Sequence, residues 1–465
     1  MGTLAVKLNG GTADISDAAV AELRASMRGT LFCASDDGYD SARRVWNANI
    51  DRHPALIARC AGVSDVQQAI LFAHEHDLCL AVRGGGHSAP GYGTNDGGLV
   101  VDLSTMKGIR VDPVNRTARA EGGALWCDLD HETQAFGLAT TGGTVSNTGI
   151  GGLTLGGGLG WLHGLHGLTI DNLLSVDLVA ADGSLLTVSD TEHPDLFWAL
   201  RGGGGNFGVA VSFEYKLHPV TTVLGGMLLY PLDRGGEVLR LYRDFCPDLP
   251  DEAGLAAGCL TGPDGTAVAG LIPAYTGDID TGLKTFARIE KELGQPLLNT
   301  VGPMTYAARQ SLLDEPNAIH GLHRYWRSAF SETLTDKFID TLVEGAGNFG
   351  SPRDAFLLFY LNGAATRVDP DATAFAARKP QWDFDAIGCW ENADESSERI
   401  AWVRELWQRV EPELEGTVYL NHLSADDLPE KLRASYGSNY QRLQRIKAQY
   451  DPDNLFRHNA NIAPA

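Results

Sequence analysis

The sequence predicts an α+β protein of two domains, and three observations carry this prediction. The chain has 465 residues, more than a single hydrophobic core usually organises. Glycine clusters crowd the segment 84–208. From about residue 222 to 417 they give way to apolar strand-like runs that alternate with amphipathic helices, a pattern typical of a sheet with helices over one face.

Composition limits the kind of protein. With 43% hydrophobic and 21% charged residues the chain is typical of soluble globular proteins. It contains no apolar run of the roughly 18 to 20 residues that span a bilayer, and its first residues lack a secretion signal, so we expect a cytoplasmic protein without a membrane partner. The net charge of -22 repels polyanions and argues against nucleic acid as a partner.

The cysteines indicate no metal site. All seven lack CxxC pairing and zinc-ligand spacing, so we expect scattered, mostly buried side chains and no bound metal.

The elements of the first domain follow from local signals. A strand, a helix and a second strand over 55–59, 64–76 and 78–82 predict a strand-helix-strand unit. Helices over 14–28 and 39–46 precede this unit. A strand over 98–103, a hairpin around 112–115 and a helix over 125–134 follow it.

The segment Arg83-Gly84-Gly85-Gly86-His87-Ser88 follows the second strand of that unit directly. Three consecutive glycines let a backbone approach a ligand closely, and His87 places an imidazole at the point of approach. A phosphate-bearing cofactor is the natural candidate.

Residues 140–161 form the most glycine-dense segment, with nine glycines in 22 positions. Each glycine inside a helix or strand costs about 0.5 to 1 kcal/mol relative to alanine, so we expect irregular backbone here that encloses a ligand. Tight turns in a β-rich domain are the alternative.

A third cluster, Gly202 to Gly208, contains a misleading match to GxGxxG. A hairpin over 173–189 and a helix over 195–201 precede it, and a strand over 209–217 follows. A dinucleotide-binding Rossmann site needs the reverse order, strand before and helix after. No cluster ends in Gly-Lys-Ser/Thr, so a P-loop is also excluded.

The second domain is predicted from 222 to 417. Its strands are expected over 225–230, 267–275, 355–361 and 386–390, and its helices over 235–245, 280–293, 334–345 and 395–410. Aromatic and polar residues on its strands could line a cavity or belong to the core; they are Trp326, Tyr360, Asn362, Trp390 and Glu391. After it come Tyr419-Leu420-Asn421-His422, a helix near 428–449 and a tail over 450–462.

These motifs together resemble a known family. Arg-Gly-Gly-Gly-His-Ser, the segment from Thr140 to Trp161, Asp195 to Gly208 and the terminal Tyr450-Asp451-Pro452-Asp453-Asn454-Leu455-Phe456 closely resemble the berberine-bridge-enzyme-like flavoprotein oxidases of the vanillyl-alcohol-oxidase superfamily. The resemblance covers nearly the whole chain.

It implies a PCMH-type FAD-binding domain over residues 1–220, with its core at about 50–220. It also implies a substrate-binding α+β domain over 221–417, and a C-terminal segment over 418–465 that completes the FAD domain.

The resemblance also implies that His87 holds FAD by an 8α-histidyl bond, a role that suits a neutral imidazole nucleophile. The other residues expected to bind the cofactor are Arg83, Gly84, Gly85, Gly86, Ser88, Gly142, Gly143, Thr144, Ser146, Asn147, Thr148, Gly149, Gly151, Gly152, Gly156, Gly157, Gly158, Val209, Asn459 and Asn461. Members with a second flavin bond place a cysteine where this chain has Val145, so a single bond is expected.

The catalytic base is expected in Tyr419-Leu420-Asn421-His422, where plant-type members end in tyrosine. Strand alternation would put Tyr419 and Asn421 on one side and His422 on the other, so only one set could face the flavin. If the family register holds, His422 replaces the tyrosine, and its unperturbed pKa near 6.5 suits a base at neutral pH. Tyr419 in this role, or His422 as a surface residue, are the alternatives.

The function implied is a monocovalent FAD oxidase. It would take hydride from a C–H bond beside an alcohol or amine of a small molecule and reduce O2 to H2O2. A dehydrogenase with another electron acceptor and a flavin-binding protein without turnover are the alternatives. The substrate and the oligomeric state are not indicated by any motif.

Overall fold

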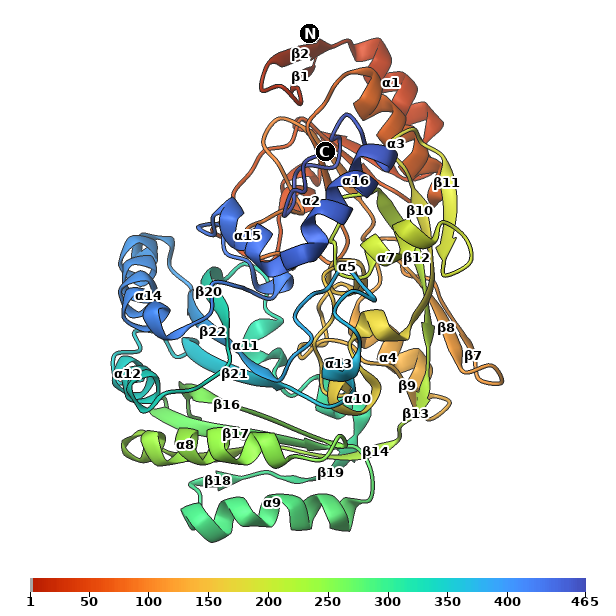
Figure 1. The fold of residues 1–465 in the computed structure, drawn as a ribbon. Helices are drawn as coiled ribbons and strands as arrows, with labels where there is room; N and C mark the ends of the chain where they lie inside the picture. Colours follow the sequence, from red (N-terminus) through yellow and green to blue (C-terminus); the bar gives the residue numbers. More distant parts are fainter. Residues whose placement is uncertain (1–2) are drawn as a thin grey trace.

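The computed structural model describes residues 3–465. Figure 1 shows that the C-terminal helices lie against the N-terminal part of the chain, while the middle of the chain forms a separate layer below them. The α+β class predicted from the sequence is confirmed, since sheets and helices segregate into layers in both parts.

A four-stranded sheet carries the first glycine cluster. Its order is β3-β4-β6-β5, in which β4 and β5 both run parallel to β6. Helices α1 and α3 bury apolar residues such as Val20 and Ile70 in the core beneath it. The elements of this region are β1 (Thr3–Val6), β2 (Thr12–Ile15), α1 (Asp17–Ser26), β3 (Thr30–Cys33), α2 (Tyr39–Arg43), β4 (Leu56–Arg59), α3 (Val63–Glu75), β5 (Leu80–Arg83) and β6 (Leu99–Asp102).

An antiparallel sheet of five strands follows, in the order β11-β10-β12-β8-β7. Helix α7 comes before residues 203–208 and strand β12 after them, which confirms that the GxGxxG match is not a Rossmann site. The elements here are β7 (Ile109–Asp112), β8 (Thr117–Glu121), α4 (Trp126–Gln134), β9 (Leu138–Ala139), α5 (Ile150–Leu155), α6 (His163–His166), η1 (Thr169–Asn172), β10 (Leu173–Val179), β11 (Leu185–Ser189), α7 (Pro194–Leu200), β12 (Val209–Lys216) and β13 (His218–Pro219).

The middle layer is built on a nine-stranded antiparallel sheet. Seven strands follow the order β18-β15-β17-β16-β21-β22-β20, and β14 and β19 pair beside β17. The strands are β14 (Thr222–Gly225), β15 (Leu228–Pro231), β16 (Ala253–Thr261), β17 (Ala267–Tyr275), β18 (Leu298–Asn299), β19 (Gly302–Thr305), β20 (His323–Ser331), β21 (Ala355–Leu361) and β22 (Gln381–Trp390). The longer helices are α8 (Gly235–Phe245), α9 (Ile279–Leu293), α12 (Asp336–Ala346) and α14 (Ser396–Val410), and the shorter are η2 (Leu232–Arg234), η3 (Cys246–Asp248), α10 (Tyr306–Gln310), α11 (Asp314–Asn317), α13 (Ala364–Arg367), η4 (Ala393–Glu395) and η5 (Glu411–Glu413).

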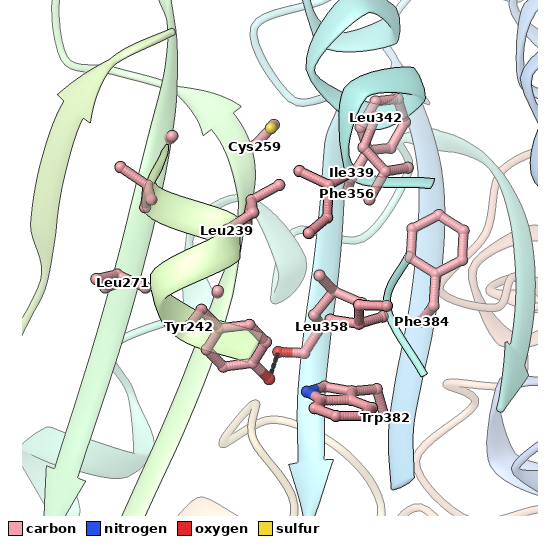
Figure 2. Packing of buried hydrophobic residues seen from close by; sticks show 14 of the residues in the cluster. Leu239, Tyr242, Cys259, Leu271, Ile339, Leu342, Phe356, Leu358, Trp382 and Phe384 are labelled. Carbon is pink, nitrogen blue, oxygen red and sulfur yellow. Dashed lines mark hydrogen bonds between the residues drawn. The ribbon is translucent and has the colours of Figure 1, made fainter. Parts of the chain in front are cut away.

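Alternation along β21 explains how this sheet is buried on both faces. Phe356 and Leu358 join the core formed with α8, α9, α12 and α14, whereas Leu357 and Phe359 join a second core with residues of the glycine-rich segment. Figure 2 shows the first core, where Tyr242 of α8 donates a hydrogen bond to the Leu358 carbonyl at 3.0 Å. Burying each such large side chain contributes about 1.5 to 3 kcal/mol. The sheet therefore presents one face to its helices and the other to the glycine segment.

The C-terminal segment returns to the first part of the chain through η6 (Leu420–His422), α15 (Pro429–Tyr436), η7 (Gly437–Asn439) and α16 (Tyr440–Tyr450). Lys447 is fully buried and bonds Asp451 and the carbonyls of Asn206 and Phe456. This buried cation fixes the tail beside the third glycine cluster.

Three predictions about local structure were wrong. Residues 420–422 form a 3-10 helix rather than a strand, so the alternation argument for Tyr419 and His422 does not apply. The glycine-dense segment contains the short helix α5. Several strands were not predicted, among them β16 and β20; β16 is rich in alanine and glycine, and pairing with β17 and β21 overrides its weak propensity.

The prediction of scattered, mostly buried cysteines is confirmed: four of the seven are buried, three are half-buried, and all are free. Within residues 3–465 no helix has both the length and the apolar character needed to cross a membrane.

Candidate active site

One cavity lies where the three glycine clusters, the middle sheet and the C-terminal segment meet. Most of the predicted site residues line it: Arg83, Gly84, Gly85, Gly86, His87, Ser88, Gly143, Thr144, Thr148, Gly149, Gly151, Gly152, Gly156, Tyr419, Asn421, His422 and Asn459. Val145, at the position where members with a second flavin bond have a cysteine, also lines the cavity, whereas Cys127 does not. Sequence segments more than 300 residues apart therefore form one site.

The other predicted residues do not line the cavity. They are Gly142, Ser146, Asn147, Gly157, Gly158, Val209 and Asn461. Val209 is fully buried in the core under the four-stranded sheet, and Gly142 packs against the Trp126 ring. Ser146 and Asn147 instead bond to other parts of the protein, Ser146 to Asp314 and Asn147 to His87.

Several lining residues were missed, among them Trp46, Tyr92, Tyr436 and His458. They come from loops and a helix outside every glycine motif, so no local signal identifies them. Of the five residues singled out on the second domain's strands, Trp326 lines the cavity. Trp390 is buried in the helix-covered core and Glu391 pairs with Arg353.

Close backbone packing explains why two of these positions are glycine. A Cβ on Gly85 would lie 2.6 Å from the backbone of Gly149, and a Cβ on Gly149 would lie 2.5 Å from Gly85. Neither backbone can move aside without disrupting its own cluster. The first and second clusters are thus locked together at the cavity wall.

His87 is held by an aromatic stack and a side-chain amide. Its ring stacks on Trp46 with centroids 4.5 Å apart and planes at 21°. Its Nε2 lies 2.9 Å from Oδ1 of Asn147. Burial, reinforced by the charge of His320, lowers the pKa of His87 to about 3, so the imidazole is neutral at physiological pH.

His422 faces two buried carboxylates. Its Nδ1 lies 3.0 Å from Asp383 Oδ2 and 3.0 Å from Asp385 Oδ1, and both aspartates lie on β22 with side chains at most 1% exposed. Burial alone would lower the pKa of His422, but the charges of Asp385 and Asp383 outweigh it and raise the pKa to about 10. His422 is therefore protonated at neutral pH, and its pKa is not the unperturbed value near 6.5 expected from the sequence.

The same three side chains offer ligand atoms within 4.8 Å of one another, a grouping that could hold a cation. The prediction that the chain binds no metal stays a prediction.

Tyr419 is fixed against the glycine segment. Its hydroxyl oxygen accepts hydrogen bonds from the backbone N–H of Gly158 at 2.9 Å and of Leu159 at 3.0 Å, and from Asn421 Nδ2 at 2.7 Å. Burial raises the pKa of Tyr419 to about 12 despite these donors. With three donors on one oxygen, the hydroxyl serves to position the 3-10 helix that carries His422.

The lining fits a flavin nucleotide. Backbone from three glycine clusters can approach a pyrophosphate, and a neutral imidazole stands beside them. Family profiles agree: the one described as an FAD binding domain matches residues 54–189, and the one described as berberine and berberine like matches 418–463. An FAD-linked oxidoreductase of Dictyostelium discoideum is 32% identical over 96% of this chain and 97% of its own length. The chain belongs to the berberine-bridge-enzyme-like FAD-linked oxidoreductases.

Other proteins similar to this chain have names that specify a substrate. The (R)-6-hydroxynicotine oxidase of Paenarthrobacter nicotinovorans is 31% identical over 94% of this chain and 97% of its own. Among solved structures, 6-hydroxy-D-nicotine oxidase of Arthrobacter nicotinovorans superposes with a TM-score of 0.85 and 28% identity, covering 95% of this chain and 99% of that one. The resemblance stated from the motifs is thus confirmed, as is FAD as the cofactor of the family.

Proposed function

We propose that this FAD-linked oxidoreductase is an oxidase with one covalent flavin bond, through His87, acting on a C–H bond beside an alcohol or amine of a small molecule. When bound, FAD supplies hydride acceptance at N5 and electron transfer to O2, which yields H2O2. The observation that carries the proposal is a single cavity lined both by neutral His87 and by His422 with its carboxylate pair. Residues 1–220 and 418–465 would form the FAD domain, and residues 221–417 the substrate domain.

His87 suits the attachment role because it is neutral and lines the cavity. An uncharged imidazole keeps a lone pair for a carbon electrophile. With Val145 in the lining and Cys127 outside it, His87 is the one side chain of the two expected attachment positions that can bond the flavin.

His422 would accept the substrate proton, with Asp383 and Asp385 as positioning residues that hold its ring and strengthen it as a base. A base whose pKa is about 10 matches the pKa of an alcohol or ammonium group better than an unperturbed imidazole does. The cost is that only a small fraction of His422 is proton-free at pH 7. The site with two carboxylates and one imidazolium favours a neutral or cationic substrate.

Anaerobic reduction of the bound flavin across a panel of amines, alcohols and sugars tests this function. We expect one class to bleach the flavin, with a rate that rises from neutral pH toward pH 10, and we expect peroxide when air is admitted. Bleaching without peroxide would identify the dehydrogenase, and a flavin that no compound bleaches would identify a non-catalytic flavoprotein.

A variant of His422 tests its role as the base. His422→Ala should reduce the flavin more slowly by roughly a factor of 10² to 10⁴, as expected for a lost general base. Reduction at the parental rate would remove His422 from the reaction.

A further inference from the structure

The side-chain amide of Asn147 can have only one orientation. Its Nδ2 donates to the carbonyl of Ala318 at 2.7 Å, and its Oδ1 lies 2.9 Å from His87 Nε2. Rotating the amide by half a turn would set Oδ1 against the Ala318 carbonyl, two acceptors facing each other. Oδ1 is therefore fixed as the acceptor toward His87.

This orientation determines which nitrogen of His87 carries the proton. Because Asn147 Oδ1 can only accept, Nε2 must be the N–H donor of the neutral ring, and Nδ1 keeps its lone pair. No described residue donates a hydrogen bond to Nδ1, so the lone pair is free. The Trp46 ring covers one face of the imidazole and restricts its rotation.

We propose that Asn147 is a positioning residue for flavin attachment, which fixes the Nε2–H tautomer of His87 and so directs the bond to Nδ1. The inference rests on the proposed covalent link at His87. Among the described residues, Asn147 is the one side chain that hydrogen-bonds a ring nitrogen of His87, so its amide determines the tautomer.

The attachment step balances with molecular oxygen as the oxidant. A bond forms between His87 Nδ1 and the 8α carbon of the flavin, replacing one C–H bond of the methyl group. The methyl hydrogen would leave as a proton, and the alkylated ring, an imidazolium while it keeps Nε2–H, would then release the Nε2 proton. The two electrons of the C–H bond would pass by way of the flavin to O2, which with these two protons gives H2O2. Asn147 takes no part in the electron transfer; it holds the Nε2 proton in place while the bond forms.

The acceptor of the Asn147 amide, the Ala318 carbonyl, belongs to the middle part of the chain. Ala318 follows helix α11, whose Asp314 accepts hydrogen bonds from the backbone N–H of Ser146 at 2.7 Å and from its hydroxyl at 2.6 Å. The loop at 146–147 thus has two separate contacts with residues 314–318, and only the residue of the second contact, Asn147, also bonds His87. Asp314 anchors this loop without touching His87, so it provides the control.

The test measures where and how fast the flavin becomes attached. Parent, Asn147→Ala, Asn147→Asp and Asp314→Ala proteins are made as full chains with FAD, the covalent fraction is followed with time, and the histidyl-flavin released by digestion is assigned as the Nδ1 or Nε2 isomer. Total bound flavin, covalent or not, reports whether each variant is folded.

We expect only the Nδ1 isomer in the parent. Asn147→Ala should attach flavin roughly five- to tenfold more slowly, the effect of one neutral hydrogen bond, and should yield both isomers. Asn147→Asp, which keeps an oxygen toward Nε2, should restore the single isomer, and Asp314→Ala should match the parent.

Three results would each overturn the role of Asn147. The first is a flavin bond at Nε2 in the parent, and the second is an Asn147→Ala protein with the parental attachment rate and isomer. The third is an Asp314→Ala protein whose attachment rate falls as much as that of Asn147→Ala. A parent protein that releases all its flavin on denaturation would instead overturn the proposed attachment at His87.

Discussion

Replacing Asp385 with asparagine removes one of the two charges that hold the proton on His422. At the 3.0 Å separation of Asp385 Oδ1 and His422 Nδ1, two unit charges interact by about 5 kcal/mol at an effective dielectric constant of 20, or about four pKa units. Asp383 stays beside the ring in this variant, and its own pKa is no longer raised by repulsion from Asp385. The charge of Asp383 therefore still raises the pKa of His422 in part. We expect the pKa of His422 to fall from about 10 by about two to four units.

NMR of protein labelled at histidine measures this pKa without a substrate. The His422 signal is assigned by its loss in a His422→Gln variant, and it should show a protonated ring through neutral pH in the parent. Asp354→Asn, which removes another buried carboxylate of the same layer, is the control and should leave the signal unchanged. A parental His422 that titrates near its unperturbed pKa of about 6.5, or one that Asp385→Asn does not shift, would refute the electrostatic reasoning.

Two further predictions concern stability. Gly85→Ala places a Cβ 2.6 Å from the Gly149 backbone and should lower the free energy of unfolding by about 1 to 3 kcal/mol. Gly152→Ala, whose Cβ would have no atom within 4 Å, should leave the flavin-free protein as stable as the parent. Equal thermal denaturation of the two variants would contradict this packing. Because the folded-state pKa of His422 is raised to about 10, its ion pair stabilises the fold fully below about pH 6.5, and this contribution is lost as the pH rises through 10. The melting temperatures of the parent and His422→Gln should therefore converge between pH 6 and pH 10. A constant difference between them would argue against the ion pair.

Much of the fold could be predicted because its signals are local. The strand predicted over 78–82 corresponds to β5, which ends one residue later at Arg83, and helix α8 and strands β17 and β21 have the predicted bounds. Apolar periodicity and helix-start residues act within a few positions of the chain, so they are readable without the tertiary structure. The glycine clusters likewise marked the cavity correctly.

The chemistry of the base could not be predicted, because it depends on contacts between distant segments. Asp383 and Asp385 alternate with Trp382 and Phe384, a pattern typical of a strand with one solvated face. In the structure both faces of β22 are buried, and the face that carries the carboxylates contacts His422 of the C-terminal segment. No local rule connects residues 383 and 422.

The backbone of Tyr419 to His422 was mispredicted for a similar reason. Its sequence is compatible with a strand, but the Tyr419 hydroxyl binds the turn after α5, and this contact accompanies a 3-10 helix. As a result Tyr419, Asn421 and His422 line one cavity together rather than on opposite sides.

The mass of the acid-denatured holoprotein tests the central claim most directly. We predict that the parent chain retains one flavin after denaturation, and that His87→Ala, refolded or expressed with FAD, retains none while still binding the cofactor reversibly. Release of the flavin from the denatured parent, or a flavin that stays bound to the denatured His87→Ala chain, would contradict the single attachment at His87.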